Sequence, residues 1–181
     1  EDAGKPLPLV DKLVVNLIIE SQPRWLNFQK GKVDYIGIPK DNFDSAIVPG
    51  KGLSEDLAKM GITLNITPSL DVTYVAFNHD NKLFDNVALR RAMSMAYDVE
   101  RGNKLFYNST AMVAQSVVPP GIAGNVSGYK NPYRGLNVDG AKKMLAEAGY
   151  PNGTGLPVIT YDTASSTVSR QQGEFFKKQM E

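Results

Sequence analysis

The stretch from Thr73 to Glu100 reads T-Y-V-A-F-N-H-D-N-K-L-F-D-N-V-A-L-R-R-A-M-S-M-A-Y-D-V-E and decides the fold class. It opens within a run rich in β-branched and aromatic residues, which predicts a strand over 72–78. A polar run follows, and we expect its His79 to face solvent in a turn. Apolar residues then recur at the i, i+3, i+4, i+7, i+8 spacing of an amphipathic helix over 85–101, namely Leu89, Ala92, Met93, Ala96 and Tyr97.

The residues before this stretch predict an alternation of strands and helices. Strands are expected at 12–20, whose sequence is KLVVNLIIE, at 33–36, and at 61–68, where apolar residues alternate. Ser21 should cap a helix that ends before Gly31. Asp41 should cap a helical turn over 43–48, and Ser54 should cap a third helix. Pro68 and Ser69 break the last strand, so we place a boundary between two lobes near Leu70.

The residues after the stretch predict one long loop and two more helices. Residues 116–137 are rich in Gly and Pro, and a loop of this length is often functional. An amphipathic helix over 138–148 should end at Gly149 in the left-handed conformation. A strand over 157–162 and a helix over 167–180 follow. The fold class expected is α/β with mixed sheets.

Composition excludes several functions. The chain has 181 residues, a formal net charge of +1, no Cys and a single His. Thiolate chemistry and a multi-His metal site are therefore excluded, and no strong field attracts nucleic acid or an anionic membrane. No nucleotide-binding or nucleophile motif is present, so we expect neither an enzyme nor a cofactor. The N-terminal residues do not resemble a signal peptide, and the last helical pattern reaches the C-terminus without a capping residue. We therefore expect the chain to be truncated at both ends.

Four motifs in order resemble the bacterial extracellular solute-binding proteins of family 5, which bind oligopeptides, dipeptides or nickel for ABC importers. Thr73 to Asp98 resembles the family pattern T-x-Y-x-x-F-N, then F-x-D, a helix with Arg and Ala, and A-x-D. The other three are FQKGKVD at 28–34, VPP at 118–120 and AKKMLAEAGYPNG at 141–153. The chain departs from the pattern at Leu83, Ala88 and Val99, where the family has Pro, Arg and Arg.

The resemblance implies a periplasmic binding protein of class II with two lobes around a cleft. Residues 1–70 would belong to the first lobe and residues 71–181 to the first part of the second. The implied function is that of a monomeric substrate-binding component, periplasmic or on the extracellular face of the membrane, with a lipid anchor as an option. It would capture small peptides and deliver them to a membrane permease. The alternatives are a nickel complex, an oligosaccharide, an opine, or a sensor lobe without transport.

The resemblance also points to ligand contacts. Arg170 lies where the family carries an Arg or His that meets the ligand's carboxylate, and a guanidinium suits a carboxylate bidentately. Ser169 lies beside it. Tyr74 follows the expected lobe crossing and would offer a ring face and a hydroxyl. Arg90 and Asp98 are expected to tie the helix to its neighbours instead of touching ligand.

Overall fold

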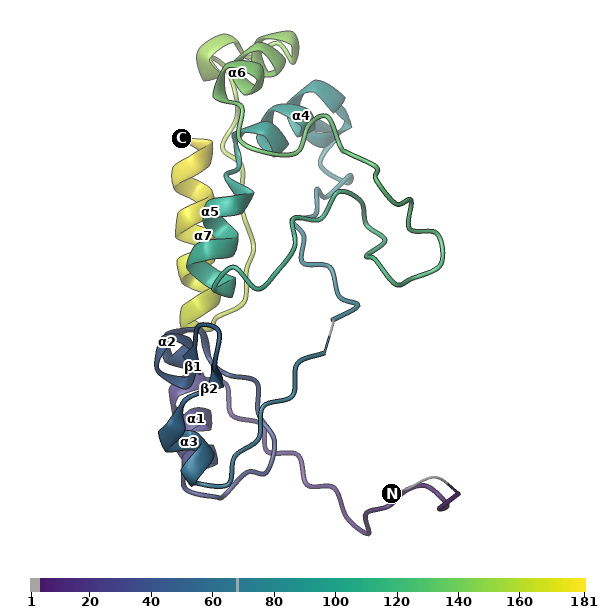
Figure 1. The fold of residues 1–181 in the computed structure, drawn as a ribbon. Coiled ribbons are helices and arrows are strands. Elements are labelled where there is room, and N and C mark those ends of the chain that lie inside the picture. Colours follow the sequence, from purple (N-terminus) through teal and green to yellow (C-terminus); the bar gives the residue numbers. More distant parts are fainter. Residues whose placement is uncertain (1–3, 68) are drawn as a thin grey trace. The chain divides into compact units, whose positions relative to one another are not determined.

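The computed structural model describes residues 4–67 and 69–181 of the chain (Figure 1). Two compact units divide it, one over Glu1–Pro39 and the other over Lys40–Glu181. Most of the regular structure lies in the second unit, and helices dominate it. The predicted α/β class with mixed sheets is correct only in part. The described residues combine helices with one two-stranded sheet.

The first unit contains α1 (Ser21–Gln29), and its other described residues form no helix or strand. Trp25 on α1 is buried and lies against Phe28, with ring centroids 5.8 Å apart. Gly31 has φ +67 just beyond the helix, which is the left-handed C-terminal position expected for it. The expected cap by the Ser21 side chain was wrong, because Ser21 is the first helical residue and Glu20 occupies the N-cap.

The second unit begins with a helical turn and a hairpin. Its elements are η1 (Lys40–Asn42), α2 (Phe43–Ala46), β1 (Ile47–Val48), β2 (Gly52–Leu53) and α3 (Glu55–Lys59). The strands pair antiparallel, with Ile47 opposite Leu53. Gly50 and Gly52 have positive φ and allow the tight connection. Ser54 occupies the N-cap position of α3, as predicted, but its side chain makes no capping hydrogen bond.

The remaining elements are helical. They are η2 (Lys82–Asp85), α4 (Val87–Ala96), α5 (Val99–Tyr107), α6 (Val138–Glu147), η3 (Pro151–Gly153) and α7 (Thr167–Met180). α4 packs against α6, and α5 runs alongside α7 (Figure 1). The helix predicted over 138–148 is confirmed, with Gly149 at φ +95, as is the helix over 167–180. Residues 116–137 contain no helix or strand, as predicted, and the irregular segment already begins at Asn108.

The single helix predicted over 85–101 was wrong, because the chain breaks between α4 and α5. Tyr97 is extended, with φ −86 and ψ 119, and its ring packs on Phe175 and Phe176 of α7. Asp98 then starts a new helix, since its Oδ1 accepts a hydrogen bond from Arg101 N at 2.9 Å. The helix also begins later than predicted, because Asn86 caps α4 and Val87 is its first residue.

The strands predicted over 12–20, 33–36, 61–68, 72–78 and 157–162 do not form among the described residues, and Pro68, the last residue of the third, lies outside them. None of their apolar side chains is fully buried, and several are exposed, with Leu17 at 93% and Val158 at 97%. A strand is stabilised by pairing and by burial of one face, and these segments have neither in this structure.

Asn86 joins the start of α4 to the end of α6. Its Oδ1 accepts from Leu89 N at 3.2 Å, and its Nδ2 donates to the carbonyl of Ala148 at 2.9 Å. We expect Asn86→Ala to lower the free energy of unfolding by about 2 kcal/mol, since a cap and a cross-helix hydrogen bond are both lost. Urea unfolding followed by circular dichroism measures the loss.

Asn86→Asp is the matched control for this prediction. It keeps the capping oxygen but replaces the donor by an acceptor that faces the Ala148 carbonyl. We expect a loss from the missing cross-helix bond and from repulsion between the two oxygens, while the cap is retained. An Asp variant as stable as the native chain would mean that the bond to the Ala148 carbonyl contributes nothing.

Candidate functional site

The first turn of α7 gathers the polar groups that surround Arg170. Ser166 is the N-cap, and its Oγ accepts from Ser169 N at 3.2 Å and lies 2.8 Å from Ser169 Oγ. Thr163 Oγ1 donates to the carbonyl of Ser169 at 3.5 Å. Ser and Thr favour this position because their oxygens satisfy amide groups that the helix leaves without partners.

Arg170 is exposed and bonded only to neutral oxygens among the contacts described. Its Nη1 donates to the carbonyl of Ser165 at 2.7 Å, and its Nη2 to Thr167 Oγ1 at 3.4 Å. No carboxylate of the described residues lies within ion-pair distance of it. A ligand carboxylate would thus meet a guanidinium whose charge no protein carboxylate offsets in this part of the chain.

Tyr74 lies in an irregular segment and is 75% exposed. Among the described residues it makes no hydrogen bond or ring contact with Ser169 or Arg170. The structure therefore brings Ser169 and Arg170 together on one turn, and places Tyr74 on a separate segment with its ring open to solvent.

His79 lies in a solvent-facing turn, as expected. Its Nδ1 is 3.4 Å from Asp85 Oδ1, and Lys82 Nζ is 3.5 Å from the other oxygen of that carboxylate. Asn78 Oδ1 accepts from Asp80 N at 3.0 Å and fixes the turn. Within residues 4–67 and 69–181, no three His, Cys, Asp or Glu side chains lie close enough to hold a metal ion.

Arg90 and Asp98 have the structural partners expected of them. Arg90 Nη1 donates to the carbonyl of Phe84, which ties α4 to η2. Asp98 caps α5, and its backbone N donates to Gln179 Oε1 of α7 at 2.7 Å. Both residues therefore organise the helices.

Sequence reasoning missed a depression of about 350 Å³ at the break between α4 and α5. Its lining includes Asp98 and Glu100 at the start of α5, and Arg134 and Asn137 just before α6. These two groups are distant in the sequence, so no local motif marks the depression. The one available signal was the length of the Gly- and Pro-rich loop that supplies residues 132–137.

The described residues form no helix that is both long enough and apolar enough to cross a bilayer. No solved structure matches the chain.

Several curated proteins are similar to the chain. Heme-binding protein A of Haemophilus influenzae is 32% identical over 80% of this chain and 24% of its own length. The oligopeptide-binding protein of Bacillus subtilis is 26% identical over 96% of this chain and 32% of its own length. The glutathione-binding protein of Escherichia coli is 30% identical over 81% of this chain and 26% of its own length.

The chain thus spans about a quarter to a third of the length of these relatives, each of which is named as a binding protein. The family model described as "Bacterial extracellular solute-binding proteins, family 5 Middle" matches residues 2–181, which is nearly the whole chain. As the four sequence motifs predicted, the chain belongs to the bacterial extracellular solute-binding proteins of family 5.

Proposed function

We propose that this chain is part of the substrate-binding component of an ABC importer, a monomer that captures small peptides in a cleft between two lobes. Residues 1–70 would contribute to the first lobe and residues 71–181 to the second. The compact units of this structure divide at Pro39, and the lobe boundary near residue 70 stays a prediction. The loaded receptor would deliver its peptide to a membrane permease on the periplasmic or extracellular side.

The observation that carries this proposal is the state of Arg170. An exposed guanidinium held by a carbonyl and a hydroxyl, with no carboxylate partner in the described residues, retains its full charge for a ligand. The ligand's free C-terminal carboxylate would replace the Ser165 carbonyl as its partner. Charge-assisted hydrogen bonds are stronger than the neutral ones they replace, so the exchange favours binding.

Ser169 and Tyr74 are the two further contacts we propose. Ser169 Oγ shares a hydrogen bond with Ser166 Oγ, which leaves its remaining lone pair or proton for a ligand amide. Tyr74 presents an uncovered ring and hydroxyl suited to a peptide backbone. The two would contact different parts of one bound peptide after the lobes close.

Calorimetry on the full-length receptor tests the proposal. Arg170→Ala should weaken binding of a tripeptide by roughly 10- to 100-fold, as expected for loss of a hydrogen bond to a charged group. The same peptide with an amidated C-terminus should bind the native receptor weakly and lose little more in the variant. If Arg170→Ala weakened both peptides equally, Arg170 would not be the carboxylate contact.

The same calorimetry distinguishes a peptide receptor from a receptor for one of the alternative solutes, namely a nickel complex, an oligosaccharide or an opine. A receptor for one of these would show no heat with any peptide of a di- to hexapeptide library. A sensor lobe without transport would instead bind peptide but be encoded without a neighbouring permease and ATPase.

A further inference from the structure

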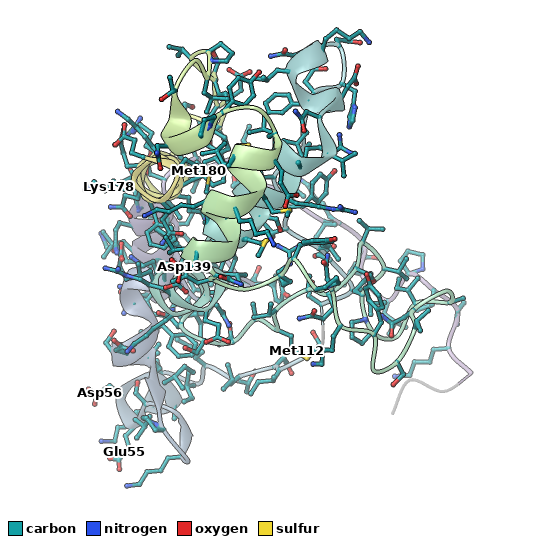
Figure 2. The ribbon with its side chains drawn as sticks, turned by 90° about the horizontal axis from the view of Figure 1, so that it is seen from above. Glu55, Asp56, Met112, Asp139, Lys178 and Met180 are labelled. Carbon is teal, nitrogen blue, oxygen red and sulfur yellow. The ribbon has the colours of Figure 1, made fainter. Side chains whose placement is uncertain are left out.

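The turn after α6 holds the one Asn-Gly pair of the sequence, Asn152-Gly153. Helix α6 begins at the turn that carries Asp139, labelled in Figure 2, and η3, which contains the pair, packs on the other end of the helix. Asn is a thermally labile residue. The Gly that follows it has no side chain, so its backbone nitrogen can approach the Asn side chain without a steric barrier. The sequence thus places a reactive pair at the end of α6.

The reaction open to this pair is deamidation. Gly153 N bonds to Asn152 Cγ and loses its proton, while the bond from Cγ to Nδ2 breaks and the side-chain nitrogen leaves as ammonia with that proton. Water then adds to a carbonyl of the succinimide ring and opens it. The product is Asp, or isoaspartate, in which the main chain runs through Cγ. Nothing is oxidised or reduced, and water is the only co-reactant.

The backbone of the folded turn holds the two reacting atoms apart. Asn152 has φ 53 and ψ 27, a left-handed conformation that Asn tolerates better than most residues. At this ψ the Gly153 nitrogen lies nearly trans to the Asn152 Cβ across the Cα–C bond. The nitrogen therefore cannot reach Cγ in any side-chain rotamer. The ψ angle must first rotate until the nitrogen and Cβ are nearly eclipsed.

Hydrogen bonds and a proline hold the turn in this conformation. Gly153 N donates to the carbonyl of Tyr150 at 2.9 Å, and Thr154 N donates to the carbonyl of Pro151 at 3.1 Å. Pro151 is the first residue of η3, and its ring fixes φ at the start of the turn. Rotation about ψ of Asn152 breaks both hydrogen bonds, so the reaction requires the turn to open.

We propose that Asn152 is a deamidation site that reacts only when the turn after α6 opens. The free energy of this local opening then sets the rate of reaction in the folded chain. Conversion to Asp lowers the formal net charge from +1 to zero. Isoaspartate also lengthens the main chain inside the turn, so the hydrogen bond from Gly153 N to the Tyr150 carbonyl cannot form again in the same geometry.

Mass spectrometry of proteolytic peptides tests this proposal on the 181-residue chain, because each conversion raises the mass by about 1 Da. The chain is incubated at mildly alkaline pH, either folded in buffer or unfolded in urea. In urea, Asn152 should be the first asparagine converted. In buffer, its conversion should be slower by about tenfold or more, because the turn is closed most of the time.

Pro151→Ala should speed the conversion of Asn152 in the folded chain by about two- to fivefold, the effect expected when a Pro in a compatible conformation is removed. The rate in urea should stay the same. Pro49→Ala is the matched control, because Pro49 lies in the turn between β1 and β2. This control should leave the rate at Asn152 unchanged in both conditions.

Two outcomes would overturn the proposal. Equal rates in buffer and in urea would mean that the folded turn gives Asn152 no protection. A Pro49→Ala chain that converts Asn152 as fast as the Pro151→Ala chain would mean that the reaction follows unfolding of the whole unit instead of opening of this turn. Neither outcome bears on the solute site, since peptide binding is measured separately.

Discussion

Leu89→Ala is expected to lower the free energy of unfolding by about 2–5 kcal/mol, the range for truncating a buried Leu. Leu89 is 1% exposed and belongs to α4, which packs against α6. The two helices approach closely at Gly140, where a Cβ would lie 2.2 Å from Met95 Cε. Little space is thus available for α6 to move into the cavity left by Leu89, which favours the upper part of the range.

Urea unfolding followed by circular dichroism measures this loss, because most helical residues belong to the second unit. The single Trp of the chain, Trp25, lies in the first unit, so its fluorescence does not report on α4. Val87→Ala, at the exposed first residue of α4, is the control and should change stability by less than about 0.5 kcal/mol. Similar losses in the two variants would mean that burial at Leu89 does not stabilise the unit.

Helices with a local cap and a clear apolar face could be predicted from the sequence. The helix over 138–148 carries both signals, since Asn137 caps it and Gly149 ends it. The long helix over 85–101 shows the limit of this reasoning. Its apolar periodicity continues through Tyr97. In the structure the Tyr97 ring packs on α7 and Asp98 caps a second helix, so the chain forms two helices where the periodicity predicts one.

The predicted strands failed for a different reason. Alternation of apolar residues indicates which side chains share a face of a strand, but it does not indicate which other segment pairs with that strand. Residues 12–20 and 61–67 carry the pattern, and Leu17 and Ile66 remain exposed because no strand lies beside them in this structure. Strand formation depends on distant partners, whereas a helix satisfies its own backbone.

The candidate site was predictable in its residue types only. The cluster of Ser and Thr before α7 predicts a helix start, and Arg170 falls in its first turn. The contact of Arg170 with the carbonyl of Ser165 depends on a side-chain conformation that no sequence pattern specifies. The depression beside Asp98 depends on a loop that returns from far along the chain, which is equally invisible in the sequence.

Phe175→Ala is expected to separate α5 from α7 and to destabilise the second unit by roughly 2–4 kcal/mol. The Phe175 ring lies 5.8 Å from the Tyr97 ring and 5.6 Å from the Phe106 ring, both edge-on. It also lies 3.5 Å from where a Cβ on Gly102 would be, so α5 packs closely upon it. Because Phe175 is only partly buried, the expected loss is below that of a fully buried Phe.

Tyr97 provides a local measurement of the same change. Burial raises the pKa of Tyr97 above its ordinary value of 10.0, with smaller contributions from Tyr107, Tyr161 and Asp98. A raised pKa means that the stability linked to this group is fully present below pH 10.0 and is lost as the pH rises through the folded-state pKa. Removing the Phe175 ring uncovers Tyr97, so its pKa should fall toward the ordinary value, and this part of the alkaline loss of stability should shrink.

Ultraviolet absorbance of tyrosinate during an alkaline titration follows this pKa, and Tyr97→Phe identifies which signal belongs to Tyr97. Phe175→Leu is the matched control, because it keeps an apolar side chain over Tyr97 while removing the ring. It should retain most of the stability and leave the pKa of Tyr97 raised. An unchanged Tyr97 titration in Phe175→Ala would show that other residues bury the phenol, and that the α5–α7 contact does not depend on Phe175.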